Sequence, residues 1–502
     1  MSEKRGQLRI DHLHEDLGGR SVRGGAVALS GQALRFLFQL GATAVLARVL
    51  LRDDFGLVAM VTATTGILLL VKDFGLGDVT VQHEEIEDAE VTTLFWVGVA
   101  FSAAAALIVL ALAPLLAWFF ERPELFGITA GMTGVFFASG LGVQHRALLQ
   151  RQMRFGRIAA IELGALIVGQ ASAVVAALAG AGYWALVLMP IVTALAQTVG
   201  AWWACPWRPG KAAPLKSVRG YLGFGSNLTG AQFFNYIARN ADDVIIGRLF
   251  GAGSLALYSK AYQLLMLPIR QVNQPIHPIA VSTLGRLTSQ PDRYRDTFVR
   301  IVEKTCLVTI PGAALMIVAS DWIILTVLGP QWSGAGELLA ILGLAALVQP
   351  LANATGWLFI TQKRTASMRR WSLVGGSLTM IAFVAGIPWG VRGMALSYAV
   401  SGLLVRTPIL FWWVGRAGPV RAGDIWRCAL AGACGGVGVL VTVGVARDAL
   451  DALPAPFALA AALPIALIGG LAGVAASPAG RAVVVDSLHM VRVLFGRRRN
   501  QS

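Results

Sequence analysis

Charged residues are scarce in this chain of 502 residues: they make up 14% of it, against 56% hydrophobic residues and a mean hydropathy of +0.66. A soluble protein would carry roughly 25% charged residues. Apolar runs of about 20 residues recur from end to end, and each run is long enough to cross the hydrocarbon core of a bilayer. The composition therefore excludes a soluble globular protein and predicts an all-α, polytopic membrane protein.

Features of several other protein classes are missing. The first 22 residues contain no apolar core, which argues against a cleavable signal peptide. The cysteines form no C-x-x-C pair, so we expect neither a metal site nor a disulfide framework. No loop is long enough to hold a soluble catalytic domain, and no D-x-D motif occurs. We therefore expect a protein that is not an enzyme and that needs no cofactor.

The net charge of +15 comes from short basic clusters between the apolar runs. The clusters occupy alternate loops, at 146–157, 208–219, 286–300, 363–370, 416–427 and 497–499. Positive loops stay in the cytoplasm, so the pattern encodes topology rather than a nucleic-acid surface. With about fourteen spans, both termini are predicted to be cytoplasmic. The loop at 72–90, with one Lys and seven acids, departs from the pattern, although acids contribute little to orientation.

A linker at 206–219, rich in Pro, Gly and basic residues, divides the chain into two halves. An even number of predicted spans separates the starts of the halves, so we expect parallel repeats. The predicted organisation is a cytoplasmic N-terminal tail at 1–22, a six-helix lobe at 23–205, the cytoplasmic linker, a second six-helix lobe at 220–415, two extra transmembrane helices at 416–475 and a basic cytoplasmic tail at 476–502. The last tail is expected to lie on anionic lipid.

Polar residues at helical spacing mark the first span of each half. The stripes consist of Gln32, Arg35 and Gln39 in one half, and of Gln232, Asn235, Arg239, Asp242 and Asp243 in the other. Such residues share one face of a helix. A charge at mid-bilayer costs about 2.5–3.5 kcal/mol on insertion scales and faces protein or a water-filled cavity. Two matching stripes predict a polar cleft between the halves. A structural ion pair of Arg239 with its neighbouring carboxylates remains the alternative.

Two further spans carry polar residues near prolines. In the segment MLPIRQVNQPIHPIA (266–280), three prolines are expected to interrupt the helix around Arg270, Asn273, Gln274 and His277. Broken helices with polar centres indicate substrate sites in transporters. The segment VQPLANATGW (348–357) is a milder version. Arg406 lies about two turns from the cytoplasmic end of its span, so we expect it to snorkel toward that end.

Three segments carry a family resemblance. LARVLLRDDFGLVAMV (46–61), VKDFGLGDVTVQ (71–82) and NADDVIIGRLFGAGSLALYSKAYQLLMLPI (240–269) resemble the bacterial oligosaccharide flippases of the polysaccharide transporter family. The similarity is to the colanic-acid-exporter type, within the multidrug/oligosaccharidyl-lipid/polysaccharide exporter superfamily. The resemblance implies two six-helix bundles plus two C-terminal helices. It also implies alternating-access translocation of a polyprenyl-diphosphate-linked oligosaccharide, the repeat unit of a surface polysaccharide, across the bacterial cytoplasmic membrane.

The implied chemistry suits the polar residues. Arginine offers charged, bidentate donors to phosphate oxygens. Our hypothesis is that Arg35, Arg239 and Arg270 hold the diphosphate, that Gln32, Gln39, Asn235, Asn273 and Gln274 contact sugar or order water, and that Asp242, Asp243 and His277 balance charge or bind a coupling Na⁺ or H⁺. For His277, a hydrogen-bonded helix residue is the alternative. Implied partners are membrane lipids, a polysaccharide polymerase and glycosyltransferases, without nucleic acid.

Two other transport functions share the superfamily. A cation-coupled multidrug antiporter would favour an acidic, aromatic-lined cavity, whereas the mid-membrane charges here are mostly Arg. A lipid-linked peptidoglycan-precursor flippase would act on a similar headgroup. The sequence does not name the sugar, the coupling ion or the oligomeric state.

Overall fold

The computed structural model describes residues 35–71, 75–83, 86–478 and 480–481, apart from the side chains at 70, 71, 82, 215–235 and 237–239. Within those ranges every regular element is a helix, which confirms the predicted all-α class. Eight helices in the described residues are long and apolar enough to cross a membrane, or up to nine if one bent pair forms a single span. The expected number of about fourteen spans is therefore not confirmed.

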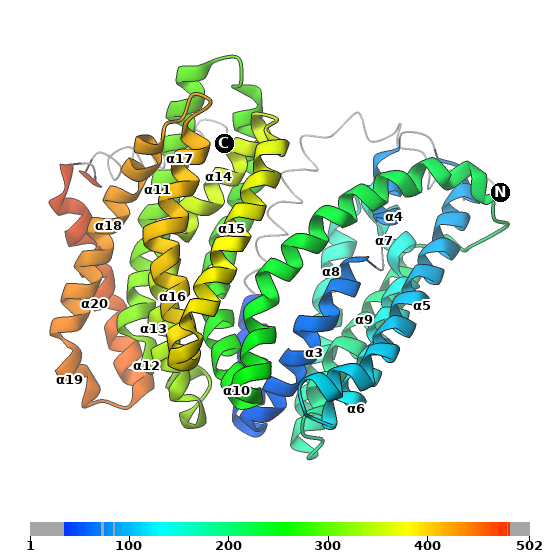
Figure 1. Cartoon of the computed structure of the whole chain (residues 1–502), viewed down its shortest axis with the longest axis horizontal. Coiled ribbons are helices and arrows are strands. Elements are labelled where there is room, and N and C mark those ends of the chain that lie inside the picture. The colour runs from blue at the N-terminus through cyan, green and yellow to red at the C-terminus, as the bar shows by residue number, and fades with distance from the viewer. Residues whose placement is uncertain (1–34, 72–74, 84–85, 479, 482–502) are drawn as a thin grey trace, which may run out of the picture. The chain divides into compact units, whose positions relative to one another are not determined.

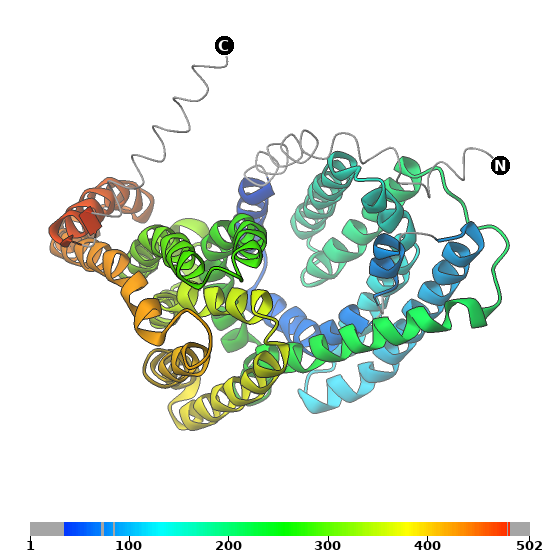
Figure 2. The ribbon, with the colours of Figure 1, turned by 90° about the horizontal axis from the view of Figure 1, so that it is seen from above.

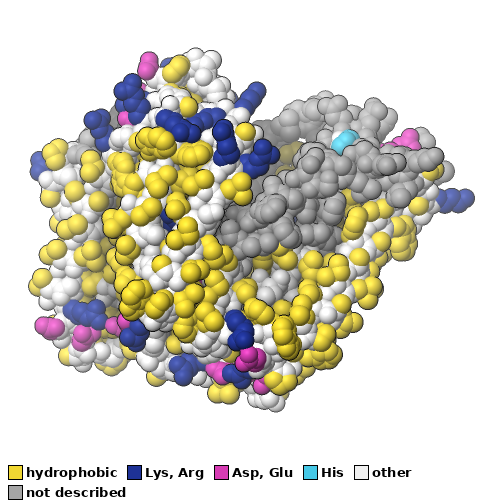
Figure 3. Space-filling model, in the orientation of Figure 1, with side chains coloured by type: hydrophobic (Ala, Val, Ile, Leu, Met, Phe, Trp, Pro, Cys, Tyr) yellow, Lys and Arg dark blue, Asp and Glu magenta, His cyan; other side chains and the backbone are white. Residues whose placement is uncertain are grey.

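Apolar side chains cover the outside of the helices. Leu107, Val175 and Val199 are each 67% exposed, and many other large hydrophobic residues are exposed with them. A band of hydrophobic side chains covers α15 and α16, and Lys and Arg gather beyond its upper end (Figure 3). Exposed apolar surface of this extent is stable against lipid rather than water. The chain is a multi-pass membrane protein.

The chain divides into two compact units, Met1–Ala256 and Leu257–Ser502. In the first unit, helical residues 35–49 precede α3 (Arg52–Val71), α4 (Leu76–Gln82), α5 (Asp88–Phe119), α6 (Glu124–Gly140), α7 (Val143–Arg151), α8 (Phe155–Leu178) and α9 (Trp184–Ala204). Two helix pairs, α5 with α6 and α8 with α9, pack along their lengths (Figures 1 and 2). The six-helix lobes and tails predicted from the sequence stay predictions.

Residues 206–214, the first part of the predicted linker, lie against the start of α5. Trp207 is fully buried and its Nε1 donates to Asp88 Oδ1 at 2.6 Å. Two residues of α5 hold Ala213: Ala89 O accepts from the Ala213 amide at 3.2 Å, and Thr93 Oγ1 donates to the Ala213 carbonyl at 3.0 Å. Both backbone polar groups of Ala213 are thus satisfied by the first unit. Helix α10 begins directly after it, at Leu215.

Helix α10 (Leu215–Arg286) contains a break at Gly251. The backbone there has φ 81° and ψ 176°, a conformation that glycine adopts without steric cost. The expected interruption at 266–280 is wrong, because the helix continues through Pro268, Pro275 and Pro278. Proline removes one intrahelical hydrogen bond but leaves φ near its helical value, and transmembrane helices tolerate this where other groups satisfy the freed carbonyl.

The second unit takes the chain from Leu257, within α10, to the C-terminal helices. It contains α11 (Pro291–Val318), α12 (Ser320–Val327), α13 (Gly334–Ala346), α14 (Gln349–Thr361), α15 (Thr365–Gly386), α16 (Gly390–Ser401), α17 (Thr407–Gly415), α18 (Ala422–Val445), α19 (Arg447–Asp451) and α20 (Ala455–Ala476), with the short turns η2 (Pro330–Trp332), η3 (Ile387–Trp389) and η4 (Gly402–Arg406). Helices α13 and α14 meet at 42°, and this bend agrees with the milder interruption of a span that the sequence at 348–357 indicates.

Small residues set the contact between α18 and α20. A Cβ atom added to Gly438 would lie 2.1 Å from the Gly469 carbonyl oxygen, and one added to Gly473 would lie 2.2 Å from the Cys434 carbonyl oxygen. The two backbones therefore approach more closely than any larger residue allows. This packing by small residues is typical of helix pairs in membranes, where association depends on close contact rather than on exclusion of water.

Candidate functional site

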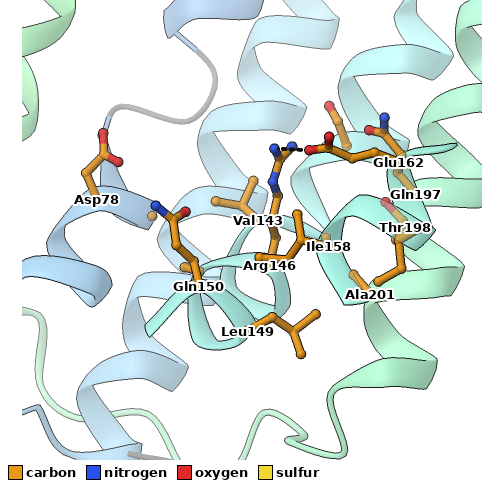
Figure 4. Close-up of a pocket in the computed structure, with 16 residues that line it drawn as sticks. Asp78, Val143, Arg146, Leu149, Gln150, Ile158, Glu162, Gln197, Thr198 and Ala201 are labelled. Atoms are coloured by element: carbon orange, nitrogen blue, oxygen red, sulfur yellow. Dashed lines mark hydrogen bonds and ion pairs between the residues drawn. The ribbon is translucent and has the colours of Figure 1, made fainter. Parts of the chain in front are cut away.

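A cavity of about 340 Å³ lies in the first unit, among α4, α7, α8 and α9 (Figure 4). Ile158, Ile161 and Leu149 supply apolar walls. Its polar lining consists of Asp78, Ser139, Arg146, Gln150, Glu162, Gln197 and Thr198. A pocket with apolar walls and a few converging polar groups is the usual form of a small-molecule or headgroup site.

Local hydrogen bonds fix the two short helices beside the cavity. Thr80 of α4 donates to Gln144 of α7 at 2.8 Å, and Arg151 at the end of α7 donates to the Thr80 carbonyl at 3.0 Å. Gly142 precedes α7, and a Cβ there would lie 2.8 Å from Thr198 Oγ1. The absence of a side chain at Gly142 thus lets α9 approach this junction, which brings Thr198 to the cavity wall.

An ion cluster closes one side of the cavity. Arg35 Nη2 donates to Glu162 Oε2 at 2.8 Å, and Arg146 Nη2 donates to Glu162 Oε1. Figure 4 shows Arg146 of α7 and Glu162 of α8 pointing toward one another, with Asp78 and Gln150 on another part of the wall. One carboxylate therefore serves two guanidinium groups that come from elements far apart in the sequence. Only 24% of the Glu162 side chain is exposed.

The charges of this cluster suit exchange of anions. The lining itself carries one positive charge, on Arg146, and two negative ones, on Asp78 and Glu162. Arg35, which pairs with Glu162 but does not line the cavity, supplies a second positive charge, so the four charges balance. An entering phosphate can offer oxygens with the bidentate geometry that guanidinium groups prefer. To reach both arginines it would have to replace Glu162. The amide groups of Gln150 and Gln197 could bind sugar hydroxyls.

The structure describes only part of the two predicted polar stripes. Arg35 is half-buried and contacts Glu162. Gln39, one helical turn on, is also half-buried. Gln32 lies outside the described residues, and so do the side chains of Asn235 and Arg239.

The carboxylates of α10 lie inside the first unit. Asp242 is 8% exposed and Asp243 is half-buried. Nearby, Tyr236 donates to the Thr62 carbonyl at 2.8 Å and holds this part of α10 against α3. Gly66 leaves room for the tyrosine, since a Cβ there would lie 2.1 Å from the hydroxyl. The ion-coupling role suggested for the two carboxylates stays a prediction.

The remaining predicted residues lie on the part of α10 that belongs to the second unit. Arg270 and Gln274 are exposed. Asn273 is half-buried, and its Nδ2 atom is buried without a hydrogen-bond partner among the described residues. His277 accepts a hydrogen bond at its Nδ1 from Trp357 Nε1 at 3.0 Å. Indole is only a donor, so this contact needs an unprotonated Nδ1. It fits the hydrogen-bonded alternative for His277.

The convergence of Arg35, Arg239 and Arg270 on one cleft stays a prediction, because each unit is described by itself. Sequence reasoning missed Glu162, which binds Arg35, and treated Arg146 only as a topology marker. A signal was present. Glu162 is the one carboxylate in the apolar sequence of α8, FGRIAAIELGALIVGQASAVVAAL, and such a residue needs a partner.

Comparisons with known proteins place this architecture in a family. The family described as "Polysaccharide biosynthesis protein" matches residues 45–337, which include all three segments that carry the resemblance. The chain is 25% identical over 368 residues to the lipopolysaccharide biosynthesis protein WzxC of Escherichia coli (strain K12), covering 72% of this chain and 73% of that protein. It is 23% identical over 297 residues to the teichuronic acid biosynthesis protein TuaB of Bacillus subtilis (strain 168), covering 59% and 62%.

A solved structure agrees with the fold. The lipid II flippase MurJ, in an inward closed conformation, superposes with a TM-score of 0.71 over 89% of this chain and 98% of that chain, at 11% identity. At that identity the likeness concerns the fold. The family match covers more than half of the sequence and agrees with the helical membrane architecture. The chain belongs to the polysaccharide biosynthesis protein family of membrane transporters.

Proposed function

We propose that this protein is a flippase that moves a polyprenyl-diphosphate-linked oligosaccharide across the bacterial cytoplasmic membrane by alternating access. The observation that carries the proposal is the cavity lined by Glu162 and Arg146, in which Glu162 forms ion pairs with Arg146 and with the neighbouring Arg35. Membership of the polysaccharide biosynthesis family supports it, and so do relatives named for the synthesis of lipopolysaccharide and teichuronic acid.

In the proposed cycle the headgroup enters the cavity and its diphosphate takes the place of Glu162. Arg35 and Arg146 then hold phosphate oxygens through charge-assisted hydrogen bonds, which are stronger than bonds between neutral groups. Gln197 and Gln150 bind the sugar, and the polyprenyl tail stays in lipid. On release, Glu162 pairs again with both arginines, so that neither charge is left in a low-dielectric site without a partner.

This function implies a setting for the protein. Both termini would lie in the cytoplasm, as the basic loops at 146–157 and 363–370 suggest. The protein would act without catalysing a chemical reaction, after glycosyltransferases complete the lipid-linked unit and before a polymerase uses it. Na⁺ or H⁺ gradients are candidate driving forces. The remaining predicted residues, Arg239 and Arg270 among them, would extend the path of the headgroup.

Deletion of the gene tests the proposal. A lipid-linked oligosaccharide should accumulate on the cytoplasmic leaflet, and one surface polysaccharide should be lost while wall synthesis continues. Arrest of wall synthesis would instead indicate a peptidoglycan precursor as the substrate. Loss of drug resistance without loss of any polymer would indicate a multidrug antiporter. Either result would overturn the proposed substrate.

Complementation of the deletion tests the site. Arg35→Gln should abolish export while the protein still inserts in the membrane. Arg157→Gln is the matched control, because Arg157 is an exposed arginine near the same end of the unit, where its side chain donates to the Ala204 carbonyl at 3.2 Å and does not line the cavity. Full export by Arg35→Gln, or equal loss with Arg157→Gln, would contradict the assignment of the cavity.

A further inference from the structure

Arg406 lies in an unusual part of the second unit. It ends η4, a five-residue π-helical segment between α16 and α17. The π-helical geometry is rare and is often found at functional sites. Helix α16, η4 and α17 follow one another without a gap from Gly390 to Gly415, and an α-helix of that many residues is about 39 Å long. The middle of that length falls at η4.

Three contacts hold the guanidinium group of Arg406. Nη1 donates to Thr379 Oγ1 of α15 at 2.6 Å, and Nη2 donates to the Tyr398 carbonyl at 3.1 Å. The guanidinium carbon lies 4.3 Å from the centre of the Tyr398 ring, which itself stacks on Phe383. Gly402 makes room for the group, since a Cβ there would lie 2.8 Å from Nη2.

These contacts point the charge into the span. Tyr398 and Gly402 precede Arg406 by two turns and one turn, so the side chain runs away from the basic end marked by Arg416 and Arg421. Thr379 lies beyond the middle of α15 on that same far side. The expectation that Arg406 snorkels to the near end is therefore wrong: position in the helix did not reveal the rotamer or the space at Gly402.

The charge lacks a carboxylate partner within the described part of the chain. No Asp or Glu occurs in the sequence between Glu337 and Asp424, which includes the whole of α15, α16 and α17. Glu337 pairs with Arg392, at 2.9 Å, and Asp424 pairs with Arg295. The Nε atom of Arg406 is buried and has no hydrogen-bond partner among described residues. A positive charge at this depth is costly and is usually retained for function.

We propose that Arg406, with Thr379 and Tyr398, forms an anion subsite in the second unit, which takes a phosphate or carboxylate oxygen of the transported glycolipid. This inference rests on the proposed function. It gives the protein a second anion site, in addition to the Arg35–Glu162–Arg146 cluster of the first unit. The two sites differ in how the positive charge is balanced. In the first unit a carboxylate of the protein balances the arginines, whereas the described residues that contact Arg406 offer it neutral oxygens and an aromatic ring. An anion from the substrate supplies the missing counter-charge.

Two parts of the substrate carry such an oxygen: the diphosphate link and any acidic sugar. The purified full-length protein can be tested in proteoliposomes with two synthetic lipids, a polyprenyl-diphosphate-linked neutral saccharide and the same lipid with a uronic acid. If Arg406 binds the diphosphate, Arg406→Gln should slow the movement of both lipids by about tenfold or more. If it binds the sugar carboxylate, only the acidic lipid should slow. Arg406→Lys should retain part of the rate, because the charge remains.

Arg392→Gln is the matched control, since Arg392 belongs to the same α16–α17 stretch and is exposed. Inorganic diphosphate and glucuronate, added as soluble competitors, give a second measurement: one of them should inhibit the wild type and inhibit Arg406→Gln less. Equal rates for Arg406→Gln and Arg392→Gln, with equal inhibition, would overturn the subsite. If the wild type moves neither lipid, the proposed function itself fails.

Discussion

Arg35 and Glu162 are 127 positions apart in the sequence and share a hydrogen bond of 2.8 Å across the first unit. The second oxygen of Glu162 binds Arg146. Loss of the carboxylate would leave two guanidinium groups without their counter-charge, whereas loss of one arginine would leave the other pair intact. The glutamate is thus the shared element of the cluster, and its replacement tests the exchange of anions most directly.

Glu162→Gln should increase the affinity for inorganic diphosphate by on the order of tenfold, because a competing negative charge is removed from beside two arginines. Isothermal titration at low salt measures the dissociation constant. Glu121→Gln is the control, since Glu121 pairs with Arg248 at 2.7 Å and does not line the cavity. Unchanged or weaker binding by Glu162→Gln would show that the carboxylate does not compete with the anion.

Gly438→Ala should lower the free energy of unfolding by about 1–3 kcal/mol, because the added methyl group would overlap the backbone of α20. Gly444→Ala is the matched change in the same helix, where a Cβ meets nothing within 4 Å. It should be neutral or slightly stabilising, since alanine favours the helix. Thermal unfolding in detergent measures both. Equal melting temperatures would contradict the close approach of α18 and α20.

Trp207→Ala should destabilise the first unit by about 3–5 kcal/mol, the usual cost of removing a large buried aromatic side chain. It would also leave Asp88 without its indole donor. Trp203→Ala provides the comparison, since Trp203 is four positions earlier and 88% exposed. Differential scanning calorimetry of the purified proteins separates the two. Comparable effects would mean that residue 207 does not anchor the segment.

Cys205 should react slowly with maleimide in the folded protein. It is 1% exposed, and burial raises the pKa of its thiol above the ordinary value, so less thiolate is present at neutral pH. The labelling rate should therefore rise with pH and should increase on unfolding in denaturant. Mass spectrometry of labelled peptides measures both effects. Rapid labelling of folded protein at neutral pH would contradict this burial.

The membrane class, and the expectation that Arg35 faces protein rather than lipid, could be predicted from the sequence, because both depend on local composition and on helical spacing. Scarce charge and long apolar runs have few solutions other than transmembrane helices. A central arginine must face protein, whatever its partner is. The partner itself, Glu162, could not be predicted, because the pairing depends on how α8 packs against the first span.

Two other features depended on local geometry that residue patterns do not encode. The prolines at 268, 275 and 278 suggested a broken helix, yet the φ angle that proline imposes fits a helix and the chain continues through them. The direction of Arg406 depended on the π-helical turn and on the space beside Gly402. The first prediction gave the prolines more effect on the backbone than they have, and the second considered only the position of Arg406 along its helix and not the space around its side chain.

The docking of Trp207 and Ala213 onto α5 has a practical consequence for anyone who modifies this protein. On a hydropathy profile the segment at 206–214 looks like the natural place for a reporter, an affinity tag or a protease site. The backbone of Ala213 is already bonded to Ala89 and Thr93 of α5. An insertion would break these bonds and shift the point at which α10 begins. Residues 206–214 are thus a packed part of the first unit rather than a free linker.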